Sequence, residues 1–189
     1  MYHSRKPAVF CLSFIRKASF RPGYDDQSWQ MGFKMVHIRK ATVADVPMLA
    51  KLRFALRSPT GPVCDPEKEF LERCGQWMEQ RLRMDGPWHC WVATIDDIIV
   101  GNLWTQVVEK IPNPSQKPEC HAYLTNFYVT EEARGCGIGS RLLTAALGWC
   151  KTARVDAAFL WPTERSRSLY QRYGFAVRDD LLELIVEKP

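Results

Sequence analysis

The residues with the clearest chemical potential form a short glycine-rich segment, Arg134-Gly135-Cys136-Gly137-Ile138-Gly139-Ser140. A strand is predicted just before it and a helix just after it. Glycine permits positive φ and close approach of the backbone to another group. The first turn of a helix adds unpaired N–H groups and the positive end of the dipole. The segment therefore predicts an anion site, most naturally for a phosphate, with an arginine beside it.

The spacing of these glycines excludes two common phosphate-binding loops. The segment lacks the G-x-x-x-x-G-K-[ST] pattern of a P-loop NTPase. It also lacks G-x-G-x-x-G followed by an acidic residue about 20 positions later, which a dinucleotide-binding fold would carry. A purely connecting turn is disfavoured by the flanking strand and helix.

A second group of polar residues lies near the end of the chain. Thr163, Ser166 and Tyr170 are spaced three and four apart, so they share one face of a predicted helix. Tyr170 could donate a proton. Alternatively, it is a packing tyrosine whose hydroxyl satisfies the core. Thr163 follows Pro162 and is predicted to cap the helix.

Three segments together resemble the GNAT superfamily of N-acetyltransferases. Arg134-x-x-Gly137-x-Gly139 is similar to the loop that binds the pyrophosphate of acyl-CoA. Phe127-Tyr128-Val129 is similar to the strand that pairs with the pantetheine arm. Residues 169–175 (LYQRYGF) are similar to the family's L-Y-x-x-x-G-F signature. The resemblance covers about residues 36–187.

The resemblance implies an α/β fold, the GNAT acyl-CoA N-acyltransferase fold. Its mixed central sheet of about six to seven strands would be flanked by four helices. It also implies an enzyme, an N-acetyltransferase that moves an acetyl group from acetyl-CoA to a primary amine by direct attack on the thioester. Acetyl-CoA is the expected co-substrate, no metal is expected, and the acceptor is a small molecule or a protein.

By the same resemblance, Tyr170 is the expected general acid and the Val129 N–H the expected oxyanion donor. Thr163 departs from the family, because many members carry asparagine there. The residues expected to bind the cofactor are Phe127, Tyr128, Val129, Arg134, Gly135, Cys136, Gly137, Ile138, Gly139, Ser140, Thr163 and Ser166.

The base that takes the proton of the amine is expected to be His121 or Glu109. A free alkylamine is mostly protonated at neutral pH, so a base or a water chain must accept its proton. Strict alternation places Glu119, His121 and Tyr123 on the same side of the strand as Phe127 and Val129. Alternatively, each candidate is an exposed polar residue at a strand end.

The acceptor is expected to meet the segment between the first two helices, about residues 53–69. Its Arg53 and Arg57 would favour an acceptor bearing a carboxylate or a phosphate. Alternatively, both arginines are solvated surface residues.

The hydrophobic pattern predicts the elements that position these residues. Their order is β-α-α-β-β-β-α-β-α-β, a three-layer α/β arrangement. Predicted strands cover residues 36–41, 88–95, 98–108, 120–129 and 157–161, with one or two closing strands within 175–186. A first helix is predicted to follow Thr42, where a Thr-x-x-Asp sequence resembles a capping box. Three further helices are predicted over about residues 66–84, 139–153 and 163–173.

The 189 residues fit one domain preceded by a basic extension. Residues 1–34 hold six basic and two acidic side chains, or +4 of the net +5. We expect them to be a poorly ordered extension, with a signal or transit peptide as alternatives, and residues 35–189 to be the acetyltransferase domain. This domain carries only about +1, so no nucleic acid is expected as a partner. The sequence contains no apolar run of about 18 residues, so it predicts no membrane-spanning helix.

Two other functions stay open. One is a non-catalytic module that senses acyl-CoA, and the other is a toxin that acetylates aminoacyl-tRNA. Seven cysteines at wide spacing predict reduced thiols and a cytoplasmic protein. The family resemblance leaves a homodimer open.

Overall fold

A computed structural model describes residues 35–60, 65–114 and 119–186. The predicted extension over residues 1–34 lies outside them. A five-stranded sheet runs through the described part in the order β1-β2-β3-β4-β5. The strands are β1 (Val36–Lys40), β2 (Trp88–Ile95), β3 (Ile98–Glu109), β4 (Cys120–Val129) and β5 (Ala157–Phe159). The first four are antiparallel to their neighbours, and β5 runs parallel to β4.

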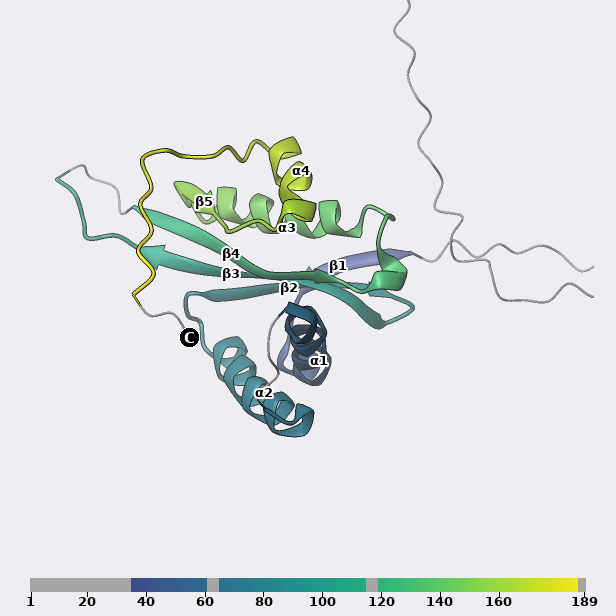
Figure 1. The fold of residues 1–189 in the computed structure, drawn as a ribbon. Helices are drawn as coiled ribbons and strands as arrows, with labels where there is room; N and C mark the ends of the chain where they lie inside the picture. The colour runs from purple at the N-terminus through teal and green to yellow at the C-terminus, as the bar shows by residue number, and fades with distance from the viewer. Residues whose placement is uncertain (1–34, 61–64, 115–118, 187–189) are drawn as a thin grey trace, which may run out of the picture.

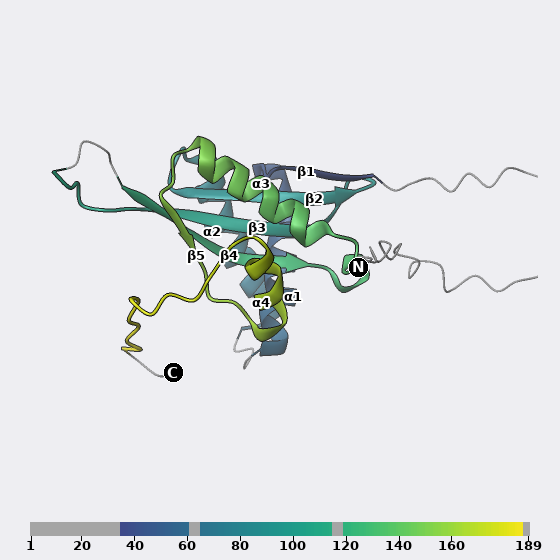
Figure 2. The same ribbon diagram turned by 90° about the horizontal axis from the view of Figure 1, so that it is seen from above.

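Four helices cover the sheet in two layers (Figure 1). They are α1 (Val46–Arg57), α2 (Glu67–Arg83), α3 (Ile138–Thr152) and α4 (Glu164–Arg172). Figure 1 shows α1 and α2 on one face, and α3 and α4 on the other. Seen from above, α3 lies obliquely across the strands (Figure 2). The three-layer prediction and the number of helices are confirmed.

Local signals explain where several elements begin and end. Asp96 and Asp97 both have positive φ, 49° and 63°, as a type I′ turn between β2 and β3 requires. Helix α2 has Glu67 and Glu69 in its first turn and arginines in its last, which suits the helix dipole.

Each helical layer buries its own apolar cluster against the sheet. Leu49 and Leu52 of α1 pack with Trp104 on one face. Leu142 and Leu143 of α3 pack with β2, β3 and β4 on the other. Close-packed residues of this kind fix the position of α3, whose first turn begins the predicted phosphate site.

The predicted closing strands are absent from the described residues. Residues 175–186 form no strand and run as a tail outside the sheet (Figures 1 and 2). Leu182 and Leu184 are 93% and 85% exposed. Their apolar, β-favouring composition suggested strands, but a strand also needs a neighbouring edge to pair with. The sheet thus has five strands here, and the expected six to seven were wrong for this part of the chain.

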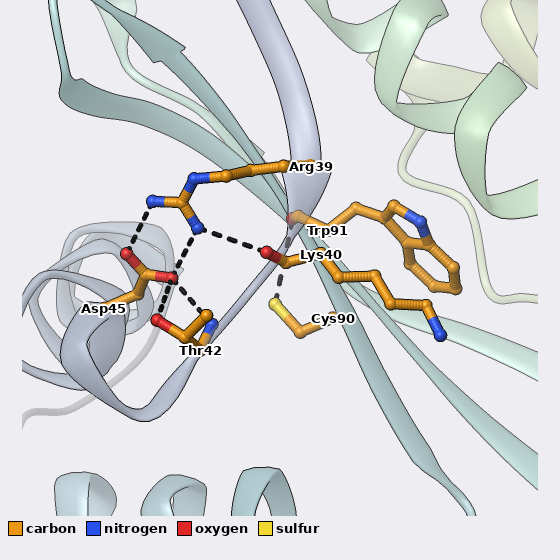
Figure 3. A network of polar contacts seen from close by, with 6 residues as sticks. All are labelled: Arg39, Lys40, Thr42, Asp45, Cys90 and Trp91. Carbon is orange, nitrogen blue, oxygen red and sulfur yellow. Dashed lines mark hydrogen bonds and ion pairs between the residues drawn. The ribbon is translucent and has the colours of Figure 1, made fainter.

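The carboxylate of Asp45 joins β1 to the start of α1 (Figure 3). It accepts two hydrogen bonds from the Arg39 guanidinium, at 2.7 and 2.8 Å. It also accepts one from the Thr42 backbone N–H at 2.7 Å, which confirms the predicted capping box. Asp45 is only 7% exposed. Its hydrogen bonds with Arg39 are the main cause that lowers the pKa of this carboxyl.

Removing this charge is expected to destabilise the protein in a pH-dependent way. Because the folded pKa of Asp45 is lowered, its stabilisation is present above the unfolded pKa of about 4 and is lost as the pH falls through the folded value. Asp45→Asn keeps an acceptor for Thr42 but loses the charge-assisted bonds, so the free energy of unfolding should fall by about 2 kcal/mol at pH 7. Urea unfolding at pH 7 and at about pH 3 checks this.

The exposed pair of Asp65 and Arg73 supplies the matched control. Asp65→Asn should cost at most about 1 kcal/mol, since exposed ion pairs contribute little. A loss for Asp45→Asn that is equally large at low pH would contradict the electrostatic explanation.

Candidate functional site

Strand β4 carries a bulge at Asn126. Thr125 pairs with Trp104 and Tyr128 with Asn102, so two residues of β4 lie opposite one of β3. Asn126 has a φ of 48°, a value that asparagine tolerates better than most residues. The buried Asn102 side chain donates a hydrogen bond to the Asn126 carbonyl at 2.7 Å and holds the bulge in place. Bulges of this kind bend a strand and redirect its side chains.

Beyond the bulge, one edge of β4 is open in the part of the chain that the structure describes, because no strand there pairs with it. Strand β5 pairs with β4 only over residues 121–123. The Thr130 N–H donates to the Val100 carbonyl of the neighbouring strand at 2.9 Å. Because backbone groups alternate in direction along a strand, the Val129 N–H and carbonyl point toward the open edge. The geometry therefore suits Val129 as a donor to a carbonyl lying along that edge.

The bulge inverts the side-chain alternation within β4. Ala122 and Leu124 lie in the cluster under α3, and Phe127 and Val129 pack against that same cluster. Tyr128 packs against the cluster on the opposite face. Residues 121 and 123 therefore lie on the other side of the strand from Phe127 and Val129. The prediction that they share one side was wrong, because strict alternation holds only for a strand without a bulge.

Helix α3 begins at Ile138, directly after the glycine loop. Gly137 is its N-cap residue, with a φ of 75°. The first backbone bond of the helix runs from the Arg141 N–H to the Gly137 carbonyl. The N–H groups of residues 138–140 therefore have no acceptor within the helix. No atom of the described residues lies within 4 Å of where a Gly137 Cβ would be, so within this part of the chain the helix end is open to an anion.

The Arg134 side chain braces the end of β4. Its Nε donates to the Val129 carbonyl at 3.0 Å, and its terminal nitrogen forms an ion pair with Glu131 at 2.7 Å. The guanidinium also lies over the Tyr128 ring, 5.5 Å from its centroid. Its side chain is 28% exposed, so part of it still faces solvent. Arg134 can thus orient Val129 while contributing positive charge to the helix start.

Tyr170 comes from α4 and reaches the same region. Its ring lies 6.2 Å from that of Phe127 and 5.7 Å from that of Phe175. Its ring belongs to the buried cluster under α3, and its hydroxyl has no hydrogen-bond partner among the described residues. Burial raises the pKa of Tyr170 to about 12, so the hydroxyl is protonated at neutral pH. The side chain can donate a proton or hydrogen bond to a group beside Phe127.

Thr163 and Ser166 lie at the start of α4. Thr163 is the N-cap residue, as predicted, but its side chain bonds the Ser166 hydroxyl at 2.9 Å instead of capping the backbone. The Ser166 hydroxyl is also within 3.0 Å of the Thr163 carbonyl. The prediction of a side-chain cap was wrong, because a second hydroxyl competes for Thr163.

The two candidate bases lie far from this region. His121 pairs with Val108 at the other end of β4, and Glu109 pairs with Cys120 next to it. His121 is six residues before Phe127, which corresponds to roughly 20 Å along a strand. The structure therefore does not bring either residue together with Tyr170 and Val129.

Three residues of the site escaped the sequence reasoning. Asn102 and Asn126 hold the bulge, and an asparagine within a predicted strand was the available signal for a positive φ. Tyr173 ties α4 to α3, because its hydroxyl donates to the Ser140 carbonyl at 2.8 Å.

Four cysteines of the described residues, Cys74, Cys90, Cys120 and Cys150, are free thiols, as the sequence predicts.

No three metal-ligating side chains gather among the described residues. No helix in residues 35–60, 65–114 and 119–186 has both the length and the apolar character needed to cross a bilayer.

Comparisons with known proteins agree with this geometry. Residues 53–175 match the family described as the Acetyltransferase (GNAT) family. The structure resembles a predicted acetyltransferase from Clostridium acetobutylicum, solved with acetyl-CoA, at a TM-score of 0.67 and 24% identity. This match covers 80% of the present chain and 97% of the other.

A GCN5-related N-acetyltransferase from Ralstonia eutropha gives a TM-score of 0.65 at 24% identity, over 81% of this chain and 100% of that one. Glucosamine-6-phosphate N-acetyltransferase from Arabidopsis thaliana gives 0.59 at 15% identity, over 81% and 99%. No curated protein matches the sequence.

Proposed function

Because the chain belongs to the GNAT family of acetyltransferases, we propose that it transfers the acetyl group of acetyl-CoA to a primary amine by direct attack on the thioester. The observation that carries the proposal is the open edge of β4 beyond the bulge, which leads to the uncapped start of α3. The edge of β4 suits a thioester carbonyl, and the start of α3 suits a pyrophosphate.

The binding roles follow from this path. The Val129 N–H donates to the thioester carbonyl, and the N–H groups of residues 137–140 hold the pyrophosphate. Arg134 keeps the Val129 carbonyl in place and adds positive charge beside the phosphates. Phe127 packs between the first turn of α3 and α4, since a Cβ on Gly139 would meet both Phe127 and Leu169.

In the chemical step a C–N bond and an S–H bond form, and the C–S bond and one N–H bond break. The amine nitrogen bonds to the thioester carbon, the thiolate departs, and the amine loses a proton to water. Tyr170 donates its phenolic proton to the departing sulfur, and the resulting phenolate recovers a proton from water. Its high pKa keeps that proton available throughout the neutral range.

Tyr170 also separates this proposal from a non-catalytic acyl-CoA sensor. A sensor needs the phosphate site and the open strand edge but no proton donor. An aromatic residue without a hydroxyl would fill the space beside Phe127 equally well. The unpartnered hydroxyl therefore favours the enzyme.

The amine proton is expected to leave through water. His121→Ala and Glu109→Ala should each leave the pH dependence of kcat/KM unshifted, because both residues lie roughly 20 Å from Phe127 along the strands. The pH–rate profile of each variant checks this. A lost or displaced acidic limb in either variant would restore that residue as the general base.

A panel of amines tests the activity as a whole. Release of CoA thiol from acetyl-CoA should depend on the amine and should saturate with it. Binding of CoA, measured by calorimetry, serves as the control. Saturable CoA binding without thiol release for any amine class would favour the sensor instead.

A further inference from the structure

Arg53 on α1 is a half-buried cation that faces the bulge. Its terminal nitrogen donates to the Asn126 side-chain oxygen at 3.3 Å. Within residues 35–60, 65–114 and 119–186 it forms no ion pair with a carboxylate. Burial is the main cause that lowers the pKa of Arg53, and nearby Arg57 adds to it. A partly desolvated charge without a counter-ion raises the free energy of the protein, so an anionic group of a ligand would bind favourably beside Arg53.

The position of Arg53 relates it directly to the proposed reaction. Asn126 immediately precedes Phe127, at the point where the edge of β4 opens. Its carbonyl is fixed by Asn102 and its side chain contacts Arg53. Val129, the expected donor to the thioester carbonyl, lies three residues beyond Asn126, so an anionic group on Arg53 would lie roughly 10 Å from it along the strand.

An aromatic cluster lies on the face of β4 that also faces Arg53 of α1. Tyr123 stacks on Phe159 with ring centroids 5.4 Å apart, and Trp161 meets their edges at 5.0 and 5.7 Å. Tyr123 lies three residues before Asn126, the residue that Arg53 contacts. Trp161 is 56% exposed, so the cluster is not closed off as core packing. An accessible aromatic wall of this kind holds flat apolar groups.

We propose that the acceptor is a small amino acid that carries a primary amine, a carboxylate held by Arg53 and a flat apolar side chain held by Tyr123, Phe159 and Trp161. This proposal rests on the proposed function and names the substrate class of the same site. The carboxylate neutralises Arg53, and the amine, a few ångströms from the carboxylate in an α-amino acid, extends along β4 toward the thioester held by Val129.

The probes for a test are matched pairs of amines. L-Phenylalanine carries all three features, 2-phenylethylamine lacks the carboxylate, and glycine lacks the ring. We expect kcat/KM for L-phenylalanine to exceed that for 2-phenylethylamine by about 100-fold, as the loss of a charge-assisted contact to a half-buried arginine requires, and to exceed that for glycine by about 10-fold or more, as the loss of an apolar contact requires. Equal rates with and without the carboxylate would overturn the inference while leaving acetyl transfer intact.

Variants of α1 then connect the carboxylate to Arg53. Arg53→Gln, which retains a donor for Asn126, should lower kcat/KM for L-phenylalanine about 100-fold and leave the rate with 2-phenylethylamine unchanged. Lys51→Gln, an exposed position on the same helix, should change neither. A thermal melt and the Kd for acetyl-CoA, both expected unchanged, show that the fold is retained. An equal loss for both amines would contradict the assigned contact.

Binding measurements separate this inference from the proposed function. Calorimetric titration of L-phenylalanine into the protein with CoA bound should show saturable binding that Arg53→Gln weakens about 100-fold. If no amine is acetylated but this binding persists, the proposed function fails and the subsite stands. If acetyl transfer to other amines occurs but L-phenylalanine does not bind, the subsite fails alone.

Discussion

Replacing Tyr170 by phenylalanine is expected to lower kcat for acetyl transfer by about 100-fold and to leave the affinity for acetyl-CoA unchanged. The substitution removes one hydroxyl and keeps the ring that packs against Phe127 and Phe175. Without the hydroxyl, the departing thiolate must take its proton from water. The expected factor is at the low end for acid catalysis, because a phenol with a pKa of about 12 is a weak donor.

Tyr173→Phe supplies the matched comparison, since it removes the same group three residues away. The Tyr173 hydroxyl holds the Ser140 carbonyl and contacts Thr144, so its loss should lower the melting temperature without a comparable loss of kcat. Steady-state rates from pH 6 to 10 test both variants. Full kcat for Tyr170→Phe over that range would end its assignment as the acid.

Replacing Gly137 by alanine is expected to weaken acetyl-CoA binding by about 30-fold or more. Gly137 has a φ of 75°, a conformation that costs an L-residue roughly 1–2 kcal/mol. Relief of this strain would rotate the first turn of α3 and turn its N–H groups away from the pyrophosphate. The new methyl group would also project into the open space where the anion is expected.

Gly148→Ala is the control for this prediction. Gly148 lies within the same helix, has no positive φ and has open space around its Cβ position. It should leave the Kd for acetyl-CoA unchanged and stabilise the helix by up to about 1 kcal/mol. Titration calorimetry with acetyl-CoA measures both variants. An unchanged Kd for Gly137→Ala would remove the helix start from the binding site.

The glycine loop and α4 could be predicted from the sequence because their signals are local. A strand, three glycines and an amphipathic helix in succession determine where a helix begins and which N–H groups it leaves free. The structure places Gly137 at that point with the positive φ that the glycine suggested. The position of Tyr170 on the face of a short helix follows from periodicity in the same way.

The bulge could not be predicted because it depends on how two strands pair. Asn126 is displaced from the ladder, and its carbonyl accepts a hydrogen bond from Asn102, 24 residues earlier in the chain. One extra residue then inverts every side chain beyond it, which moved His121 and Tyr123 to the opposite face from Phe127. The tail over residues 175–186 illustrates the same dependence, since its composition favours a strand for which the described sheet provides no partner.

The most direct test of the central claim is a single-turnover reaction with acetyl-CoA labelled on its acetyl group, followed by mass spectrometry of the amine and of the protein. The proposed function predicts that the label appears on the nitrogen of the amine, with one CoA thiol released per label transferred. It also predicts that Tyr170→Phe slows the transfer of the label. At limiting acetyl-CoA, Gly137→Ala should lower the fraction of the protein that has acetyl-CoA bound. Tight binding of acetyl-CoA with no labelled amine from any class would contradict the claim and leave a protein that binds the cofactor without using it.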